Sequence, residues 1–209
     1  MYTETEIKLH VKDLEALAHR LLTLGATLAS PRTHELNLSF DTPAGTLSAQ
    51  TRVLRLRQDA CSKLTYKGPT ESQDGVAQRE EIEFAVSNFD AAKRFLEALS
   101  YQLTATYEKY RTTYQLDDFH IMLDEMPYGD FIEIEGDDVS AIRALAEKLS
   151  LNVDAAVKMS YLQIFDRLRS AGELRVRNLT FDEFKAKIYD LVQVSIFPAD
   201  SFHDNEKDV

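Results

Sequence analysis

The feature that most constrains this chain is the alternation of charged and apolar residues in its first stretch, residues 4–11. A β-strand directs successive side chains to opposite faces. Glu4, Glu6, Lys8 and His10 therefore share one face, and Ile7, Leu9 and Val11 share the other. One such strand is typical of an ordinary solvated surface. The pattern here recurs on nearly every later strand, and that repetition requires a structural explanation.

The predicted strands after the first one carry the same kind of ionised row. Their ranges are residues 35–40, 51–57, 63–67, 79–84, 109–114, 120–124 and 131–135. The opposite faces hold mainly Ile, Leu, Val, Phe and Tyr. The charged rows are Glu4, Glu6 and Lys8; Arg55 and Arg57; Lys63 and Lys67; Arg79, Glu81 and Glu83; Lys109 and Arg111; Asp124; Glu133 and Glu135.

Three predicted amphipathic helices need an apolar surface on which to pack. They span residues 14–24, 91–99 (with Asp90 as its cap) and 139–149, and each follows an acidic strand that begins at Glu6, Glu81 or Glu133. A closed or nearly closed sheet that turns its apolar face outward buries both apolar sets. The ionised rows then line its interior. We therefore predict an α+β fold with a charged cavity inside the sheet.

An interior rich in both charge signs is costly unless water or a ligand of matching charge fills it. The paired glutamates are hard oxygen ligands of the kind that Mg²⁺ or Mn²⁺ prefers. The arginines and lysines suit phosphate oxygens, which Arg can bind in a bidentate manner. So many cations exceed the need of one phosphate. The residues favour a divalent metal with a triphosphate.

Composition narrows the class of protein. The 209 residues are 44% hydrophobic and 28% charged, which is typical of one globular domain or of a domain with a tail. The net charge of −11 argues against non-specific nucleic-acid binding. Neither an apolar run of membrane-spanning length nor a signal-peptide layout is present. The single Cys61 cannot form an internal disulfide, so we expect a cytoplasmic protein.

The remaining segments carry no predicted chemistry. Residues 70–75 are polar and predict a mobile loop. Residues 157–169 and 180–192 show helical spacing of apolar residues, and the acidic residues 200–209 predict a frayed end.

The ordered set of motifs resembles the CYTH group, the triphosphate tunnel metalloenzymes. The resemblance rests on Glu4-x-Glu6-x-Lys8, Arg55-x-Arg57, Lys67-Gly68-Pro69, Arg79-x-Glu81-x-Glu83, Lys109-x-Arg111, Asp124, the run from Gly129 to Gly136, and Lys158-x-Ser160-Tyr161. It implies an eight-stranded antiparallel β-barrel with helices packed outside. The tunnel domain would span residues 1–165, followed by a helical extension over residues 166–209.

The resemblance also implies roles for these residues. Glu4 and Glu6, with Glu133 or Glu135, would hold the metal, while Glu83, Asp124 and the other late glutamate would hold a second metal or the attacking water. Lys8, Glu83 and Asp124 are the predicted catalytic residues. Glu81 is a further candidate metal ligand. The predicted phosphate-binding residues are Lys8, Arg55, Arg57, Lys67, Arg79, Lys109, Arg111 and Lys158.

Three functions are compatible with these residues. A metal-dependent triphosphatase is favoured over an adenylyl cyclase that makes cyclic AMP and pyrophosphate from ATP. A non-catalytic polyphosphate- or nucleotide-binding module is less favoured, because phosphate binding alone needs no carboxylates. Thiamine triphosphate is a weaker substrate candidate, since the chain has no Trp for stacking. The extension could cover one tunnel mouth or support a homodimer.

Overall fold

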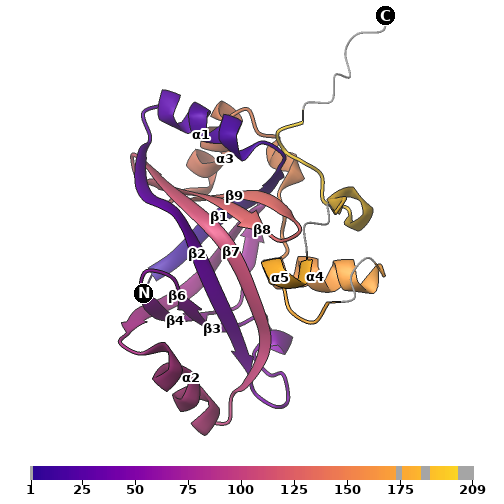
Figure 1. Ribbon diagram of the computed structural model, residues 1–209. Helices are drawn as coiled ribbons and strands as arrows, with labels where there is room; N and C mark the ends of the chain where they lie inside the picture. Colours follow the sequence, from indigo (N-terminus) through magenta and orange to yellow (C-terminus); the bar gives the residue numbers. More distant parts are fainter. Residues whose placement is uncertain (1, 173–175, 185–188, 202–209) are drawn as a thin grey trace, which may run out of the picture.

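A closed ring of eight antiparallel strands forms the body of the computed structural model, which describes residues 2–172, 176–184 and 189–201 (Figure 1). The β1–β6 pairing closes the ring. In spatial order the strands are β1 (Tyr2–Val11), β9 (Gly129–Glu135), β8 (Phe119–Met126), β7 (Gln102–Leu116), β2 (Thr27–Asp41), β3 (Val53–Gln58), β4 (Ser62–Lys67) and β6 (Val76–Val86). The predicted α+β fold and closed antiparallel sheet are confirmed.

Two strands are far longer than the sequence predicted. Both β2 and β7 have 15 residues, and they pair along almost their whole length. The predicted mobile loop at residues 70–75 is wrong in part, because β5 (Glu71–Gln73) pairs with β6 there. The backbone hydrogen bonds of that pairing order a segment whose side chains are all exposed.

The helices begin at side-chain caps. Asp13 caps α1 (Leu14–Thr23) and Asp138 caps α3 (Val139–Lys148). The prediction that Asp90 caps the second helix is wrong. Asn88 accepts the hydrogen bond from Ala91 N instead, and α2 spans Phe89–Ala98. Asp90 lies in the first turn, where its charge still favours the helix N-terminus.

Apolar side chains of the ring point outward into the core, as predicted. Helices α1 and α3 pack over β1 and β9, where Ile7, Leu9, Ile132 and Ile134 are 0% exposed. Helix α2 packs at the other end of the ring, where Leu96 contacts a smaller cluster that includes Leu54 and Leu56. The outer face of β6 is not covered in the same way, since Ile82 and Phe84 remain half-exposed.

The C-terminal region packs against one end of the ring (Figure 1). Its elements are η2 (Val153–Ala155), α4 (Tyr161–Ser170), α5 (Phe181–Phe184) and η3 (Leu191–Val194), and η1 (Ser48–Gln50) lies earlier in the chain. The predicted helix start at residue 157 is wrong, because Ser160 forms a capping box with Gln163 and α4 begins at Tyr161. The predicted domain boundary at residue 165 falls inside α4.

The helix predicted over residues 180–192 forms only in part. Residues 181–184 are helical and residues 191–194 form a 3-10 turn, while residues 185–188 lie outside the described residues. Residues 202–209, most of the predicted frayed end, also lie outside them. Ala199 N donates to His10 O, and Asp200 accepts from Lys12 N and Asp13 N, which fixes the described end beside β1 and α1. Among the described helices, none is long and apolar enough to cross a membrane.

Candidate functional site

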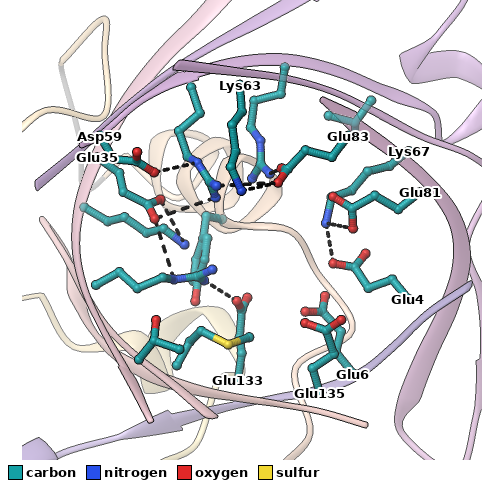
Figure 2. A pocket seen from close by; sticks show the side chains of 18 of the residues that line it. Glu4, Glu6, Glu35, Asp59, Lys63, Lys67, Glu81, Glu83, Glu133 and Glu135 are labelled. Carbon is teal, nitrogen blue, oxygen red and sulfur yellow. Dashed lines mark hydrogen bonds and ion pairs between the residues drawn. The ribbon is translucent and has the colours of Figure 1, made fainter. Parts of the chain in front are cut away.

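The ring encloses a cavity of about 960 Å³ that the charged rows line (Figure 2). Alternation along each strand turns these rows inward, because the outward positions hold the apolar core. Eight cationic and eight acidic side chains of the described residues line the cavity. They are Lys8, Arg55, Arg57, Lys63, Lys67, Arg79, Lys109 and Arg111, and Glu4, Glu6, Glu35, Asp59, Glu81, Glu83, Glu133 and Glu135.

Carboxylates gather on the β1–β9 side of the cavity. Glu6 pairs in register with Glu135, and Lys8 with Glu133, and Figure 2 shows Glu6, Glu135 and Glu133 on the same side of the cavity. Glu6 is buried, and its closest ion-pair contact is Arg79 Nη2 at 3.6 Å. Burial, together with the charges of Glu133 and Glu4, raises the pKa of Glu6 to about 7. This side of the cavity therefore has an excess of negative charge.

Glu4 is the better-neutralised member of this acidic side. Lys67 Nζ donates to Glu4 Oε1 at 2.5 Å, and Arg79 Nε donates to Glu4 Oε2 at 2.7 Å. Burial opposes ionisation, but the charges of Lys67 and Arg79 outweigh it and lower the pKa of Glu4 to about 2. Lys67 also contacts Glu81 at 3.3 Å. A cation that displaced these contacts would find an ionised carboxylate already in place.

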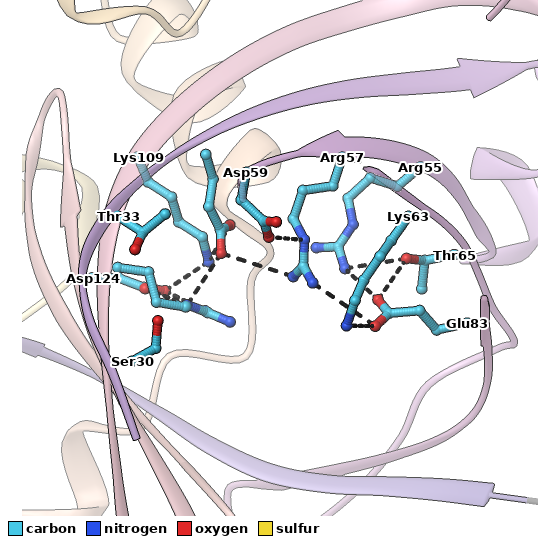
Figure 3. Close-up of polar contacts among 12 residues, drawn as sticks. Ser30, Thr33, Arg55, Arg57, Asp59, Lys63, Thr65, Glu83, Lys109 and Asp124 are labelled. Carbon is cyan, nitrogen blue, oxygen red and sulfur yellow. Dashed lines mark hydrogen bonds and ion pairs between the residues drawn. The ribbon is translucent and has the colours of Figure 1, made fainter. Parts of the chain in front are cut away.

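Cations from β3 and β4 surround Glu83 on the opposite side (Figure 3). Lys63 Nζ donates to Glu83 Oε1 at 2.7 Å, while Arg55 and Arg57 approach Glu83 at 3.9 and 3.8 Å. Burial raises the pKa of Glu83, and the hydrogen bond from Lys63 with the charge of Arg57 reverses that effect, so the pKa is lowered.

Arg55 is poorly satisfied by the protein itself. Its hydrogen bonds to Tyr107 Oη and Thr65 Oγ1 are both 3.5 Å long, and its buried Nε has no hydrogen-bond partner among the described residues. A buried guanidinium without close acceptors is unfavourable unless a ligand supplies them. Arg55 is therefore suited to receive an anion.

Asp124 lies behind the cavity wall. It is 0% exposed and accepts from Lys109 Nζ at 2.9 Å, Arg111 Nε at 2.6 Å and Tyr161 Oη at 2.7 Å. Arg111 Nη2 also contacts Glu133 Oε2 at 2.5 Å. In this arrangement Asp124 positions two cations, and it does not itself line the cavity. The sequence placed Asp124 on the correct face of its strand but could not predict that its side chain is fully buried.

The structure brings the other predicted residues together, with one exception. Lys158 is exposed, lies between η2 and α4, and does not line the cavity. Tyr161, from the same late motif, does. Its ring lies 4.3 Å from Lys8 Nζ and its backbone oxygen accepts from Tyr128 Oη at 2.9 Å. Sequence reasoning missed Tyr161 because helical spacing alone does not show which residue enters a cavity.

Replacing Tyr161 by phenylalanine removes the hydrogen bond that Tyr161 Oη donates to Asp124. We expect the free energy of unfolding to fall by about 2 kcal/mol, because hydrogen bonds to charged groups contribute that much. Urea unfolding measures the effect. Tyr114→Phe is the matched control, since Tyr114 is buried and its hydroxyl has no hydrogen bond to a residue that the structure describes. Equal losses in the two variants would contradict a role for the Tyr161–Asp124 contact.

Glu35 and Asp59 are two further lining residues that the sequence reasoning missed. Glu35 lies on the inward row of β2, at 3.6 Å from Lys109 Nζ and 3.8 Å from Arg57 Nη1. Asp59 contacts Arg57 Nε at 3.0 Å. Glu35 alternates with Asn37 and Ser39 on one face of its strand, and this alternation could have indicated that it points inward. Because Asn37 and Ser39 are neutral, the row was not recognised as part of the charged lining.

Glu35 should make stability depend on acid pH. Burial raises its pKa, but Lys109, Arg111 and Arg57 outweigh burial and lower it to about 2 from 4.5. The folded state therefore binds fewer protons, so this stabilisation is complete above pH 4.5 and is lost as pH falls toward 2. It amounts to about 3 kcal/mol. The acid-induced loss of unfolding free energy over this range should be about 3 kcal/mol smaller in Glu35→Gln than in the wild type or in exposed Glu71→Gln, while Glu4, whose pKa is also lowered to about 2, contributes a loss in all three proteins.

The acidic side fits a divalent metal in donor chemistry. Its donors are all carboxylate oxygens, the type that Mg²⁺ and Mn²⁺ select, and the ion pair that Glu6 forms within the described part of the chain is a long one, at 3.6 Å to Arg79. Within the described residues, however, no group of three or more acidic, His or Cys side chains is already placed to hold one ion. Glu4, Glu81 and Glu133 are instead paired with lysines and arginines of the cavity.

Comparison with known proteins identifies related folds. The family sequence model of the CYTH domain matches residues 2–160 of this chain. A Vibrio parahaemolyticus structure, proposed to be an adenylate cyclase, is 26% identical with a TM-score of 0.68, covering 78% of this chain and 97% of that one. The PH1012 protein of Pyrococcus horikoshii is 22% identical with a TM-score of 0.66, covering 77% and 98%.

A third structure comes from the plant Hippeastrum. This protein, HpAC1, was proposed to be an adenylyl cyclase and is described as having a dominant triphosphatase activity. It is 20% identical with a TM-score of 0.57, and the match covers 82% of this chain and 97% of HpAC1. No curated protein matches the chain.

Proposed function

Because this chain belongs to the CYTH domain family, we propose that it is a divalent-metal-dependent hydrolase that acts on a triphosphate bound inside the ring. Members of this family bind triphosphate substrates and are triphosphatases or cyclases. Residues 2–160, which the family model covers, contain all of the charged residues that line the cavity.

The observation that carries the proposal is the balance of charge in the cavity. The eight cationic and eight acidic lining residues nearly cancel. A triphosphate alone would therefore enter a cavity with little net attraction for it, and would face the carboxylates of β1 and β9. A triphosphate that arrives with divalent cations matches both sides, because the metal faces the carboxylates and the phosphate oxygens face the arginines and lysines.

The residues suited to hold the metal are Glu4 and Glu6 with Glu133 or Glu135. When bound, Mg²⁺ or Mn²⁺ would polarise phosphate oxygens as a Lewis acid. Glu81 is a further candidate because it lies beside Lys67. The sequence predicted that Asp124 binds a second metal or the attacking water. We assign it instead to positioning Lys109 and Arg111, which both donate to it.

The cations bind and orient the phosphates. Arg55 and Arg57 from β3 and Lys63 from the neighbouring β4 line the cavity, and Arg111 reaches it from β7, which β2 separates from β3. Their charge stabilises the negative charge that develops on the leaving and equatorial oxygens. Lys8 can reach the same ligand from β1, where it contacts Glu133 at 3.1 Å.

Glu83 is our candidate for the residue that accepts a proton from water. With Lys63 bonded to it, Glu83 is a weak base, because its pKa is lowered. A phosphate that attracts Lys63 and Arg57 would weaken those contacts and raise the pKa of Glu83 again. Substrate binding would thereby increase its basicity where the water must be activated.

The alternative activity is that of an adenylyl cyclase. The Vibrio relative, proposed to be an adenylate cyclase, favours it, while the dominant triphosphatase activity described for HpAC1 favours hydrolysis. Both reactions need the same metal and cations. They differ in whether water or a ribose hydroxyl attacks phosphorus.

Product analysis tests the proposal. Purified protein with Mg²⁺ or Mn²⁺ receives inorganic triphosphate or ATP in separate reactions, and phosphate, pyrophosphate and cyclic AMP are quantified. We expect phosphate release from at least one substrate. Cyclic AMP with an equal amount of pyrophosphate would make the protein a cyclase. Tight triphosphate binding without any product would refute hydrolysis and support a non-catalytic triphosphate-binding module.

A further inference from the structure

Among the neutral side chains that line the cavity, five form one patch across three consecutive strands of the ring. Ser30 and Thr33 come from β2, Thr113 from β7, and Met122 and His120 from β8. We call them the neutral wall. Ser30 pairs with Thr113, Thr113 pairs with Met122, and Met122 pairs with Glu133, so the wall is continuous across three strands and ends at the carboxylates. His120 pairs with Glu135 and is exposed at its rim.

The ring is irregular at this wall. Strand β2 carries one extra residue relative to β7 between Leu28 and Ser30, and another between Ser30 and Thr33. Such bulges bend a strand and redirect its side chains. The two side chains that β2 places on the cavity side here, Ser30 and Thr33, are small.

Contacts outside the ring hold the bulge in place. Arg32 forms two hydrogen bonds with Glu125, at 2.7 and 2.8 Å, and its guanidinium lies 3.5 Å from the centre of the Tyr110 ring. Pro31 has no N–H and needs no partner in the ladder. The bulge is thus a fixed feature of the fold.

The neutral wall does not suit a phosphate chain. It contains no lysine or arginine. Thr33 at its β2 edge pairs in register with Arg111, whereas Met122 and His120 on β8 adjoin Glu133 and Glu135, which would repel phosphate oxygens. Hydroxyl groups of a ligand could instead donate to these carboxylates and form hydrogen bonds with Ser30, Thr33 and Thr113. Thr33 Oγ1 would act there as an acceptor, because it already donates to Pro31 O at 2.8 Å. Met122 supplies an apolar contact beside them.

We propose that the neutral wall binds the sugar of a nucleoside triphosphate whose phosphates lie against the cations. This inference rests on the proposed function, because it places the organic end of the same triphosphate. The base then points toward His120 at the rim. A bare inorganic triphosphate would leave the wall in contact with water only.

The test compares consumption of ATP, deoxyATP and inorganic triphosphate, whichever products form. The variant is Ser30→Ala/Thr33→Val/Thr113→Val, which removes three hydroxyls with little change of volume. Thr112→Val is the matched control, since Thr112 is the neighbour of Thr113 on the opposite face of β7 and does not line the cavity. The readout is the ratio of kcat/KM for ATP to kcat/KM for inorganic triphosphate.

We expect the ratio to fall about 10-fold or more in the triple variant and to stay constant in Thr112→Val, since each lost hydrogen bond contributes about 1 kcal/mol. Wild-type protein should also prefer ATP to deoxyATP, which tests the wall without any mutation. A wild type that consumes inorganic triphosphate but not ATP, or an unchanged ratio in the triple variant, would overturn the inference and leave the proposed function intact. A wild type inactive on every triphosphate would instead refute the proposed function.

Discussion

Replacing Glu4 and Glu6 together by glutamine is expected to reduce triphosphate consumption about a thousandfold or more, while the protein remains folded. The double variant keeps the size of both side chains but removes two charges from the acidic side of the cavity. Lys67 retains its contact with Glu81 at 3.3 Å, and Arg79, which pairs with Glu4 and Glu6, can still donate to the amide oxygens of the two glutamines. Losing groups that stabilise a developing charge costs a factor of this size.

Steady-state kinetics with saturating Mg²⁺ or Mn²⁺ measures this loss, and circular dichroism verifies the fold. Glu80→Gln is the matched control, because Glu80 lies on β6 between Arg79 and Glu81 and does not line the cavity. A double variant within tenfold of the wild type would show that the carboxylates of β1 are not part of the reaction.

Replacing Asp124 by asparagine should destabilise the protein by about 3 kcal/mol or more. Asp124 is 0% exposed and is the shared acceptor of Lys109, Arg111 and Tyr161. Its loss leaves Lys109, which is 2% exposed, without its closest carboxylate. Removing one partner of a buried ion pair typically costs about 3–5 kcal/mol.

The same variant separates two roles for Asp124. If it positions the cations, Asp124→Asn lowers the unfolding free energy and weakens triphosphate binding, but it changes the affinity for Mn²⁺ alone by less than about twofold. If it is a metal ligand, as the sequence suggested, Mn²⁺ affinity falls as well. Asp118→Asn, at the exposed turn before β8, is the control for a general charge effect.

The sequence predicted the face of each charged residue well. In a closed ring, each strand side chain points either into the cavity or toward the outer core. Because the charged residues alternate with buried Ile7, Leu9, Ile132 and Ile134, they could be assigned to the inner face. The same reasoning could not predict how deeply each inward side chain is buried. Asp124 and Glu133 both belong to inward rows, yet Lys109 and Arg111 cover only Asp124 from the cavity.

The remaining errors arise from contacts between segments far apart in the chain. Tyr161 enters the cavity because α4 packs across the ring end, and its neighbour Lys158 then points away. The register shifts of β2 depend on its pairing with β7, which no local pattern of residues 27–34 indicates. The neutral wall could therefore not be predicted from periodicity.

The most direct test of the account is the affinity of inorganic triphosphate, measured by calorimetry with and without Mg²⁺, in the wild type and in Glu4→Gln/Glu6→Gln. Calcium- and magnesium-free buffer with a chelator provides the metal-free condition. The balanced charge of the cavity predicts that wild-type binding weakens about 100-fold or more without metal. It also predicts that the double variant, which has a surplus of two cations, binds metal-free triphosphate more tightly than the wild type does. Equally tight wild-type binding with and without metal would contradict the central claim.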